Sequence, residues 1–320
     1  MKNCFVGIDT SNYTTSVAIC DEEGRVIANL KRPLEVKQGE RGLRQSDAVF
    51  AHIKNLPLLM RELSDILCGE YRPMAVGVSS RPRDAKDSYM PCFLGGVSAA
   101  YSFAAGVGIP VFEFSHQNGH IMAAAYSSGA SDRLMSGDFL AFHVSGGTTE
   151  AVLVSPCGNS FTSALVGETR DLNAGQVIDR IGVLMGLDFP CGAQLESLAH
   201  EYTGEHKRCR ISVRDGACNL SGLENMAAEL YRSGKDKKAT AAFVFDFVGA
   251  TLKEMCTQIL SERGNMPVLF AGGVMSNKYM RNQLSKDIEA YFSEPAFSAD
   301  NAAGISLLCR KEYMGQKNEH

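Results

Sequence analysis

Two stretches of the sequence match each other without gaps: Phe5-Val-Gly-Ile-Asp-Thr-Ser-Asn-Tyr-Thr-Thr-Ser-Val-Ala-Ile19 and Phe139-Leu-Ala-Phe-His-Val-Ser-Gly-Gly-Thr-Thr-Glu-Ala-Val-Leu153. In this match Ser11 corresponds to Ser145 and Thr15 to Thr149. Each stretch reads as an apolar strand, a polar turn and a second strand, which is the pattern of a β-hairpin. Two equivalent hairpins indicate a duplicated fold.

Strands and helices alternate outside the two hairpins. Helical periodicity and runs of small or apolar residues predict helices over 50–67, 94–105, 176–185 and 241–260. Short β-like runs predict strands over 74–79, 111–114 and 268–271. Strands interleaved with helices in two equivalent halves predict two α/β lobes, and a cleft between the lobes is the natural place for a ligand.

The composition is that of an ordinary globular protein. The 320 residues include 32 Lys+Arg and 36 Asp+Glu, which gives a formal net charge of −4, and 45% are hydrophobic. These values exclude a disordered, collagen-like or coiled-coil chain. The mild acidity argues against a general nucleic-acid coat, which needs a strongly basic face. A local basic patch stays open, with a solvated loop as the alternative, at Lys31, Arg32, Lys37, Arg41 and Arg44.

Cysteine usage and the first residues indicate the compartment. The ten cysteines include no C-x-x-C pair, and scattered cysteines of this kind usually act as small buried hydrophobes in a reducing compartment. The chain starts without the apolar core of a signal peptide. The uncharged stretch from Ser88 to Phe112 is rich in Gly, Ala and Ser, which favours a packed helix and a strand over a membrane span. We therefore expect a cytoplasmic protein without a membrane partner.

Three turns have the composition of a phosphate-binding site. In Val144-Ser-Gly-Gly-Thr-Thr149 the two glycines let backbone N–H groups approach an anion, although Gly-Gly is also a favoured turn of an ordinary hairpin. The matching turn at Ser11 and a Gly-Gly turn after a predicted strand favour the nucleotide interpretation. We therefore predict nucleotide-binding roles for the turn residues Ser11, Ser145, Gly146, Gly147, Thr148, Gly272 and Gly273.

A pair of histidines has the spacing of a metal site. His116 and His120 follow a predicted helix N-cap at Ser115 and lie one helical turn apart, so both imidazoles share a face. Gln117 stands where a zinc protease has its glutamate base, which disfavours that class of hydrolase. An aspartate would complete a set that holds iron or zinc, and Asp300, between a predicted strand and a small-residue helix, is the candidate. Asp300 is equally placed to cap that helix.

A set of motifs resembles one family along nearly the whole chain. The set consists of His116-x-x-x-His120, Ser145-Gly-Gly147, Gly175-x-x-x-Asp179, Pro190-Cys-Gly192, Ser221-Gly-Leu223, Gly272-Gly-Val-x-x-Asn277 and Asp300-Asn301. In order and spacing it is similar to the threonylcarbamoyl transferases of tRNA modification, formerly described as glycoprotein endopeptidases. The resemblance implies the duplicated two-lobe α/β fold of actin, sugar kinases and heat-shock chaperones, with mixed sheets flanked by helices. It assigns residues 1–126 and 303–320 to the first lobe and 127–302 to the second, with a helical insert at about 175–240.

The resemblance also implies ligands and partners. One divalent metal ion, iron or zinc, would be bound by His116, His120 and Asp300. An adenine nucleotide or acyl-adenylate would be bound by Ser145 to Gly147, Asp179, Gly192 and Asn277. A carboxylate such as Asp179 accepts from ribose hydroxyls and an amide such as Asn277 both donates and accepts, although each could also be a surface or strand-end residue. The family implies a tRNA acceptor, a smaller paralogue and an ATPase as partners.

Several positions depart from the family pattern. The chain has Asp9-Thr-Ser-Asn-Tyr-Thr-Thr15 where these enzymes usually read Glu-Thr-Ser-Cys-Asp-Glu-Thr, so two acidic side chains are absent. The other departures are Thr148 for a His, Gln176 for a Glu, Cys191 for a Gly, Glu224 for a Lys and Arg81-Pro-Arg83 for a Gly-Pro-Gly turn. Loss of acids impairs acid–base catalysis more than binding. Three functions stay open: threonylcarbamoyl transfer to tRNA, a diverged paralogue that acts as a nucleotide-binding partner or regulator, and carbamoyl transfer to another acceptor.

Overall fold

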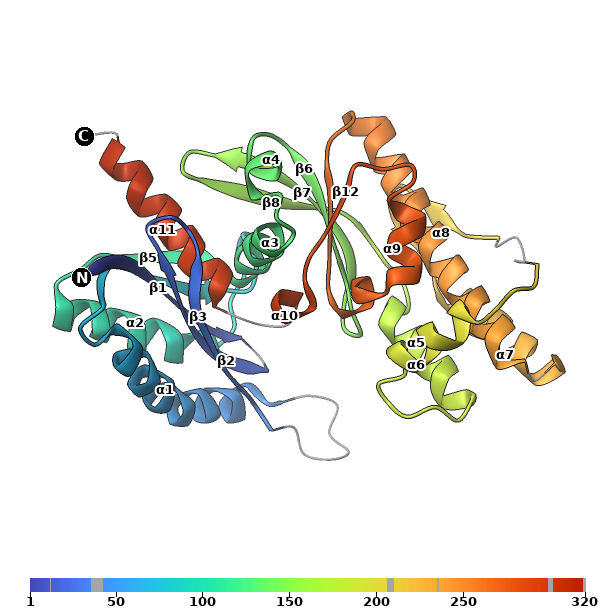
Figure 1. Cartoon of the computed structure of the whole chain (residues 1–320), viewed down its shortest axis with the longest axis horizontal. Helices are drawn as coiled ribbons and strands as arrows, with labels where there is room; N and C mark the ends of the chain where they lie inside the picture. The colour runs from blue at the N-terminus through green and yellow to red at the C-terminus, as the bar shows by residue number, and fades with distance from the viewer. Residues whose placement is uncertain (12, 36–42, 206–209, 235, 299–301, 319–320) are drawn as a thin grey trace. The chain divides into compact units, whose positions relative to one another are not determined.

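The computed structural model describes the chain apart from residues 12, 36–42, 206–209, 235, 299–301 and 319–320. The described chain forms two compact units, each with a five-stranded sheet (Figure 1). Unit 1 comprises Met1–Ser131, Pro156–Ser163 and Ala296–His320, and unit 2 comprises Asp132–Ser155 and Ala164–Pro295. The duplicated α/β architecture predicted from the two hairpins is confirmed.

The sheet of unit 1 contains β1 (Lys2–Ser11), β2 (Thr14–Asp21), β3 (Val26–Pro33), β4 (Tyr71–Arg81) and β5 (Val111–Ser115). Its order is β3-β2-β1-β4-β5. β1 pairs with β2 as an antiparallel hairpin that closes with Ser11 opposite Thr14, as the first repeat predicts. β4 runs parallel to both β1 and β5, so the sheet is mixed.

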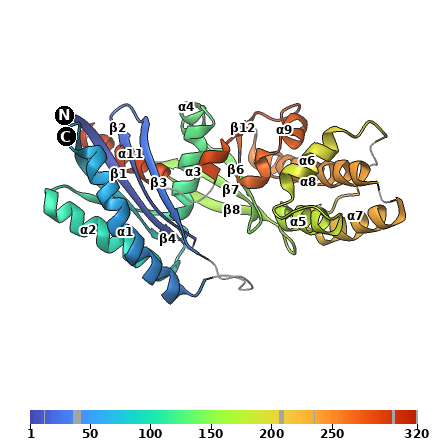
Figure 2. The same cartoon turned by 60° about the horizontal axis from the view of Figure 1, so that its bottom comes forward.

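Helices cover both faces of this sheet: α1 (Gln45–Leu67) and α2 (Phe93–Val107) on one face, α3 (His116–Ser127) and α11 (Ala303–Asn318) on the other (Figure 2). Successive residues of a strand point to opposite faces, so β1 contributes to both layers. Ile8 joins the core formed with α1 and α2, whereas the ring of Phe5 lies 5.4 Å from that of Tyr313 in α11. Asp9 points to the same side as Phe5, towards α3.

The sheet of unit 2 contains β6 (Phe139–Val144), β7 (Thr149–Cys157), β8 (Ser160–Glu168), β11 (Val268–Ala271) and β12 (Ala290–Phe292). Its order is β12-β11-β6-β7-β8, with β6 and β7 as the second hairpin. Phe142, Phe270 and Phe292 stand opposite one another on three neighbouring strands, with ring centroids 5.1 and 5.4 Å apart. This aromatic row stabilises the parallel side of the sheet.

The other helices belong mainly to unit 2, and the longest of them is α8 (Lys237–Arg263), which is buried along most of its length. The carboxylate of Asp236 caps α8 by accepting from the N–H of Ala239 at 3.0 Å. The remaining elements are α4 (Ser131–Met135), α5 (Ala174–Leu184), α6 (Gly192–His200), β9 (Val213–Arg214), β10 (Ala217–Cys218), α7 (Ser221–Gly234), the 3-10 helix η1 (Gly273–Ser276), α9 (Lys278–Leu284) and α10 (Pro295–Ser298).

The structure corrects the prediction around Asp300. The sequence predicts a strand that ends at Asp300, but β12 ends at Phe292 and the short helix α10 follows it. Pro295 fits the first turn of a helix, where a missing N–H costs nothing, and fits a strand interior poorly. Four residues of the sequence predictions lie outside the described residues: Asp300, Asn301, Lys37 and Arg41.

The uncharged stretch from Ser88 to Phe112 forms α2 and enters β5, as predicted. Across the described part of the chain, no helix combines the length and the apolar content needed to cross a membrane. The cysteines that the structure describes are free thiols, and most of them are buried.

α3 and α11 approach each other at Gly119 and Gly304. A Cβ atom on Gly304 would overlap the carbonyl oxygen of Gly119, and one on Gly119 would lie 2.8 Å from the side chain of Ile305. Glycine is therefore required at position 304, where the overlap is with backbone, whereas at Gly119 the neighbouring atom is the end of the Ile305 side chain. The contact fixes the position of α3 in unit 1, and with it the positions of His116 and His120.

Gly304→Ala is expected to lower the free energy of unfolding by about 1–3 kcal/mol, because the added methyl group has no space between the helices. Gly106→Ala is the matched control. Gly106 also lies in a helix of unit 1, but no atom lies within 4 Å of an added Cβ, so alanine there is expected to stabilise by about 0.5–1 kcal/mol. Urea denaturation measures both changes. Equal stability of Gly304→Ala and the wild type would contradict the described contact.

Candidate functional site

Unit 2 contains a cavity of about 370 Å³. Its walls come from the turn after β6, from α5, from the start of α6 and from the turn after β11. The lining includes five residues predicted to bind a nucleotide, namely Gly146, Asp179, Gly192, Gly273 and Asn277. Segments that are far apart in the sequence therefore converge on one cavity.

The turn between β6 and β7 lies at one edge of this cavity. Oγ of Ser145 accepts hydrogen bonds from the N–H groups of Gly147 at 3.2 Å and Thr148 at 3.1 Å. The turn is thus a tight hairpin in which two N–H groups point to a single oxygen atom. A phosphate oxygen is an acceptor of the same kind. The hairpin role is thus observed, and an anion would bind these two N–H groups only by replacing Oγ of Ser145 as their acceptor.

α5 begins directly behind this turn. The N–H of Gly175 donates to the carbonyl of Ser145 at 3.1 Å, and a Cβ atom on Gly175 would lie 2.7 Å from the nitrogen of Gly146. Any larger residue at position 175 must displace the turn. Gln176 completes a capping box at the helix start, where its side chain accepts from the N–H of Asn173 at 3.1 Å. The start of α5 and the turn therefore support each other.

Asp179 and the segment around Cys191 form a second wall. Oδ1 of Asp179 accepts from the N–H of Cys191 at 2.8 Å, and its second oxygen keeps the capacity to accept from a ligand. The side chain of Cys191 fills the space beside Gly182, where an added Cβ would overlap it. Burial, and then the charge of Asp179, raise the pKa of the Cys191 thiol. Cysteine is thus accommodated here as a packed neutral group.

The turn after β11 forms the third wall. Gly272 has φ of 97°, a conformation that favours glycine, and it lies against the backbone of β6. The amide oxygen of Asn277 caps α9 by accepting from the N–H of Met280 at 2.9 Å, so its NH2 group is what it offers to a ligand. Glu196 joins this wall and accepts from the N–H of Lys278 at 2.6 Å.

The structure does not place every predicted nucleotide residue on the cavity. Four of them neighbour the lining residues in the sequence without lining the cavity themselves: Ser145, Gly147, Thr148 and Gly272. Ser11 belongs to unit 1, where it is buried. Sequence reasoning missed Glu196 and Phe245, which line the cavity. Phe245 lies in an apolar run of α8 and carries no signal that separates it from a core residue.

The histidine pair lies at the start of α3 in unit 1. Oγ of Ser115 caps the helix by accepting from the N–H of Asn118 at 3.2 Å, as predicted. The Nε2 atoms of His116 and His120 lie 3.0 Å apart, with the ring planes at 77°. Two imidazole nitrogens that converge in this way fit a divalent transition-metal ion. Within the described residues no group of three His, Cys, Asp or Glu side chains forms a metal cluster, and Asp300 lies outside them.

A buried carboxylate stands behind His116. Oδ1 of Asp9 lies 2.8 Å from Nδ1 of His116 and accepts a hydrogen bond from the hydroxyl of Ser79 at 2.5 Å. Asp9 is 0% exposed, whereas the side chain of His116 is 20% exposed. Carboxylates in this position orient the histidine ligands of many metal sites. Sequence analysis did not reveal the contact, because 107 residues separate its two partners.

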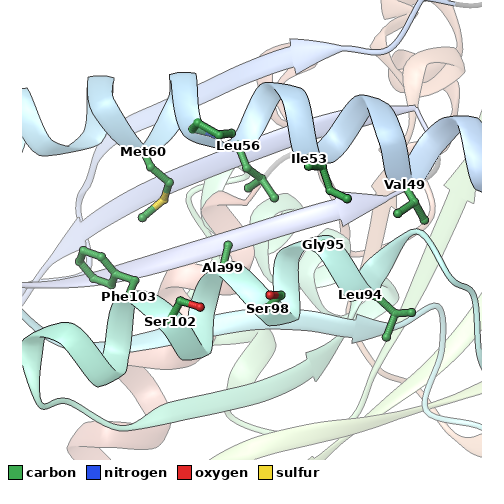
Figure 3. Close-up of a pocket in the computed structure, with 11 residues that line it drawn as sticks. Val49, Ile53, Leu56, Met60, Leu94, Gly95, Ser98, Ala99, Ser102 and Phe103 are labelled. Atoms are coloured by element: carbon green, nitrogen blue, oxygen red, sulfur yellow. The ribbon is translucent and has the colours of Figure 1, made fainter.

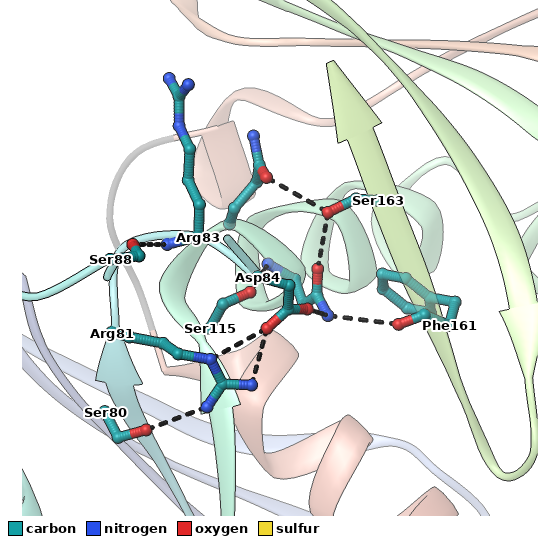
Figure 4. Close-up of polar contacts among 10 residues, drawn as sticks. Ser80, Arg81, Arg83, Asp84, Ser88, Ser115, Phe161 and Ser163 are labelled. Carbon is teal, nitrogen blue, oxygen red and sulfur yellow. Dashed lines mark hydrogen bonds and ion pairs between the residues drawn. The ribbon is translucent and has the colours of Figure 1, made fainter. Parts of the chain in front are cut away.

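The loop after β4, which stands in place of a Gly-Pro-Gly turn, is bonded to α3 (Figure 4). The guanidinium of Arg81 donates to Oδ1 of Asp84 at 2.6 and 3.0 Å. The other carboxylate oxygen of Asp84 accepts from the amide of Asn118 at 2.5 Å, and Asn118 accepts from Ser163 at 3.1 Å. Arg81 is therefore paired within unit 1.

The predicted basic patch is also partly paired. Arg32 forms an ion pair with Glu62 at 2.7 Å, and the ammonium of Lys31 donates to the carbonyl of Ala296 at 3.0 Å. Both contacts lie within unit 1. The alternative of a solvated loop is wrong for Lys31 and Arg32, because both lie in β3.

A groove of about 570 Å³ runs between α1 and α2 (Figure 3). Its lining is mostly apolar and includes Ile53, Met60, Leu94 and Phe103. Ile53 is 57% exposed and Leu94 is 52% exposed. Apolar side chains gathered in an exposed groove mark a site of association.

Curated relatives cover nearly the whole chain. The chain is 30% identical over 319 residues to a tRNA N6-adenosine threonylcarbamoyltransferase of Thermus thermophilus, covering 97% of this chain and 93% of that protein. It is 28% identical over 331 residues to the protein of the same name from Streptococcus suis, covering 96% of this chain and 92% of that protein.

Solved structures share the fold at low sequence identity. HypF of T. kodakarensis superposes with a TM-score of 0.59 at 12% identity, over 98% of this chain and 48% of that chain. The activator of the 2-hydroxyisocaproyl-CoA dehydratase of Clostridium difficile, solved with bound ADPNP, superposes with a TM-score of 0.52 at 12% identity. The match covers 99% of this chain and 98% of that chain. A ROK family glucokinase from Streptomyces griseus superposes with a TM-score of 0.51 at 12% identity, over 96% of this chain and 98% of that chain. The fold is therefore the actin-like and sugar-kinase fold that the motifs imply.

One family model matches residues 89–307, which is more than half of the chain. The matched range contains the histidine pair of α3, the turn at Ser145 and the cap at Asn277. Together with the relatives that align along nearly the full length, this match shows that the chain belongs to the tRNA N6-adenosine threonylcarbamoyltransferase family.

Proposed function

We propose that this chain is a metal-dependent acyl transferase, which moves a threonylcarbamoyl group from its adenylate to an adenosine amine of tRNA. The observation that carries the proposal is the cavity of unit 2, on which five of the predicted nucleotide-binding residues converge. Membership of the family supports the class of reaction. The facing imidazoles of unit 1 support the metal.

The cavity suits an adenine nucleotide in volume and in polarity. Its volume of about 370 Å³ falls in the range of roughly 300–1,000 Å³ that small-molecule sites occupy. The second oxygen of Asp179 would accept from a ribose hydroxyl, and the NH2 group of Asn277 would donate. The backbone of Gly146 would approach the ligand without an intervening side chain. Ile178 and Phe245 supply apolar surface for the base.

His116 and His120 would hold the metal ion through their Nε2 atoms, with Asp300 as the proposed third ligand. When bound, a divalent metal supplies Lewis-acid polarisation of the acyl carbonyl. Oγ of Ser115 caps the start of α3, on which both histidines lie. Iron and zinc both accept nitrogen and carboxylate ligands, so these residues fit either metal.

One departure from the family favours a second candidate function. Tyr13 and Thr14 occupy the positions where the family usually has acidic residues. A phenol or an aliphatic hydroxyl is a poor proton acceptor at neutral pH, so two acceptors for the proton of an attacking amine are lost. A diverged paralogue that serves as a nucleotide-binding partner or regulator would keep the cavity of unit 2 and lose the transfer. Carbamoyl transfer to a different acceptor would need the same cavity and the same metal.

Metal-loaded protein is expected to transfer the threonylcarbamoyl group from synthetic threonylcarbamoyl-adenylate to unmodified tRNA. His116→Ala should abolish transfer because one of the two imidazole ligands is lost, whereas the control Gly106→Ala should retain it. Mass spectrometry of the digested tRNA nucleosides measures the product. If the wild type, assayed with the smaller paralogue and the ATPase, binds metal and nucleotide but leaves tRNA unmodified, transfer to tRNA is excluded. The partner or regulator function and transfer to a different acceptor then remain.

Gly175→Ala is expected to weaken the binding of an adenine nucleotide about tenfold or more, equivalent to about 1.4 kcal/mol, because the new methyl group displaces the turn at Gly146. Gly137→Ala, also in unit 2, is the control, since no atom lies within 4 Å of an added Cβ there. Titration calorimetry with AMP and ATP measures the affinity. Unchanged binding by folded Gly175→Ala would place the nucleotide elsewhere.

The partner proteins implied by the resemblance are also part of the proposal. The groove between α1 and α2 supports them, since an exposed apolar strip along two helices fits the apolar face of a partner helix. We assign the smaller paralogue to this groove.

The double variant Ile53→Glu with Leu94→Glu is expected to lose co-elution with the smaller paralogue in size-exclusion chromatography, because two charges would enter an apolar interface. Leu165→Glu with Val183→Glu is the matched control, since these side chains of unit 2 are 45% and 56% exposed and lie outside the groove. A complex that survives the groove substitutions would exclude the groove. A wild-type chain that always elutes alone would exclude the partner.

A further inference from the structure

The carboxyl-terminal part of β1 carries an acidic residue that is fully buried. Asp9 is 0% exposed, on the face of the sheet that α3 covers. It is the only acidic residue between positions 9 and 15, where the family pattern usually has three. A buried charge is costly unless hydrogen bonds or a partner charge compensate it. The contacts of Asp9 therefore indicate why a carboxylate is tolerated there.

The contacts of Asp9 fix the proton positions around it. Its Oδ1 accepts the hydroxyl hydrogen bond of Ser79 at 2.5 Å and faces Nδ1 of His116 at 2.8 Å. A carboxylate oxygen can only accept, so Nδ1 of His116 carries the proton of that contact. In a neutral imidazole a proton on Nδ1 leaves Nε2 with a lone pair.

The same reasoning extends to the second histidine. Nε2 of His116 faces Nε2 of His120 at 3.0 Å, which is hydrogen-bond distance. Because Nε2 of His116 carries a lone pair, Nε2–H of His120 donates to it in the metal-free chain. That lone pair is also the one that a metal ion would receive. The carboxylate of Asp9 therefore determines which nitrogen of His116 is available as a ligand.

We propose that Asp9 is the positioning residue of the metal site, which holds the ring of His116 in the orientation and tautomer that present Nε2 to the ion. This inference rests on the metal-dependent function proposed above. In this role Asp9 acts on the metal site through the ring of His116. Ser79 steadies the carboxylate from β4, so two neighbouring strands fix one ring of α3.

The tautomer of His116 can be measured without metal and without activity. Long-range proton–nitrogen NMR of the 15N-labelled, metal-free wild type is expected to show His116 with a protonated Nδ1 and a bare Nε2. The opposite tautomer in the wild type would overturn the proposal by itself. This measurement needs no variant, so it holds even where a substitution at position 9 prevents folding.

Asp9→Asn keeps the shape of the side chain and can turn its NH2 group towards Nδ1, which would favour the Nε2-protonated tautomer of His116. We expect the Nδ1-protonated fraction to fall and the affinity for Zn²⁺, measured by competition with a chelating indicator, to fall about 10–100-fold. Asp21→Asn is the control, because Asp21 is also buried in this sheet but pairs with Arg25 at 2.7 Å. Asp21→Asn should change neither the tautomer of His116 nor the affinity for Zn²⁺.

The outcomes separate this inference from the proposed function. A wild type that binds neither Zn²⁺ nor Fe²⁺ would remove the metal-dependent function, while the tautomer of His116 would still report on Asp9. A wild type that binds Zn²⁺, with Asp9→Asn folded and equal in affinity and tautomer, would remove the positioning role and leave the metal site intact.

Discussion

The close contact between α3 and α11 is the constraint on which the site of unit 1 depends. Two glycines, Gly119 and Gly304, let the helix backbones meet, and no side chain can separate them without moving α3. The position of α3 then determines where His116 faces Asp9 and where it faces His120. Tight helix packing thus supplies the precision that two converging imidazoles require.

The departures from the family pattern in unit 2 do not fall on the lining of its cavity, which includes none of Thr148, Gln176, Cys191 and Glu224. Gln176 performs the capping role of a glutamate, since both side chains can accept from an N–H group. Cys191 occupies space that Gly182 leaves open. Glu224, where the family has a lysine, forms an ion pair with Arg180 at 2.9 Å. These substitutions change side chains while the turns that line the cavity keep their backbone groups.

Local patterns in the sequence predicted the fold and the histidine pair at the start of α3. The two hairpins follow from alternation and from their mutual match, and the facing imidazoles follow from the helical repeat. Three features depend on tertiary contacts that no local pattern encodes: the Asp9–His116 pair, the groove at Ile53 and the cavity wall at Glu196. The prediction of a strand before Asp300 is wrong because Pro295–Ser298 forms the helix α10, and a proline fits the first turn of a helix better than the interior of a strand.

Binding and catalysis make different demands on this chain. A transferase and a non-catalytic paralogue both need the cavity of unit 2, but only the transferase needs an acceptor for the proton of the attacking amine. Asp9 is a poor candidate for that acceptor, because it is fully buried and its Oδ1 already accepts from Ser79 and His116. Under the proposed function, the absence of acids at Tyr13 and Thr14 would weaken proton transfer. Neither residue lines the cavity of unit 2 or takes part in the His116–His120 contact. Retention of the cavity and of the histidine pair is therefore expected of a transferase and of a non-catalytic paralogue alike, whereas acids near position 13 are expected of the transferase alone.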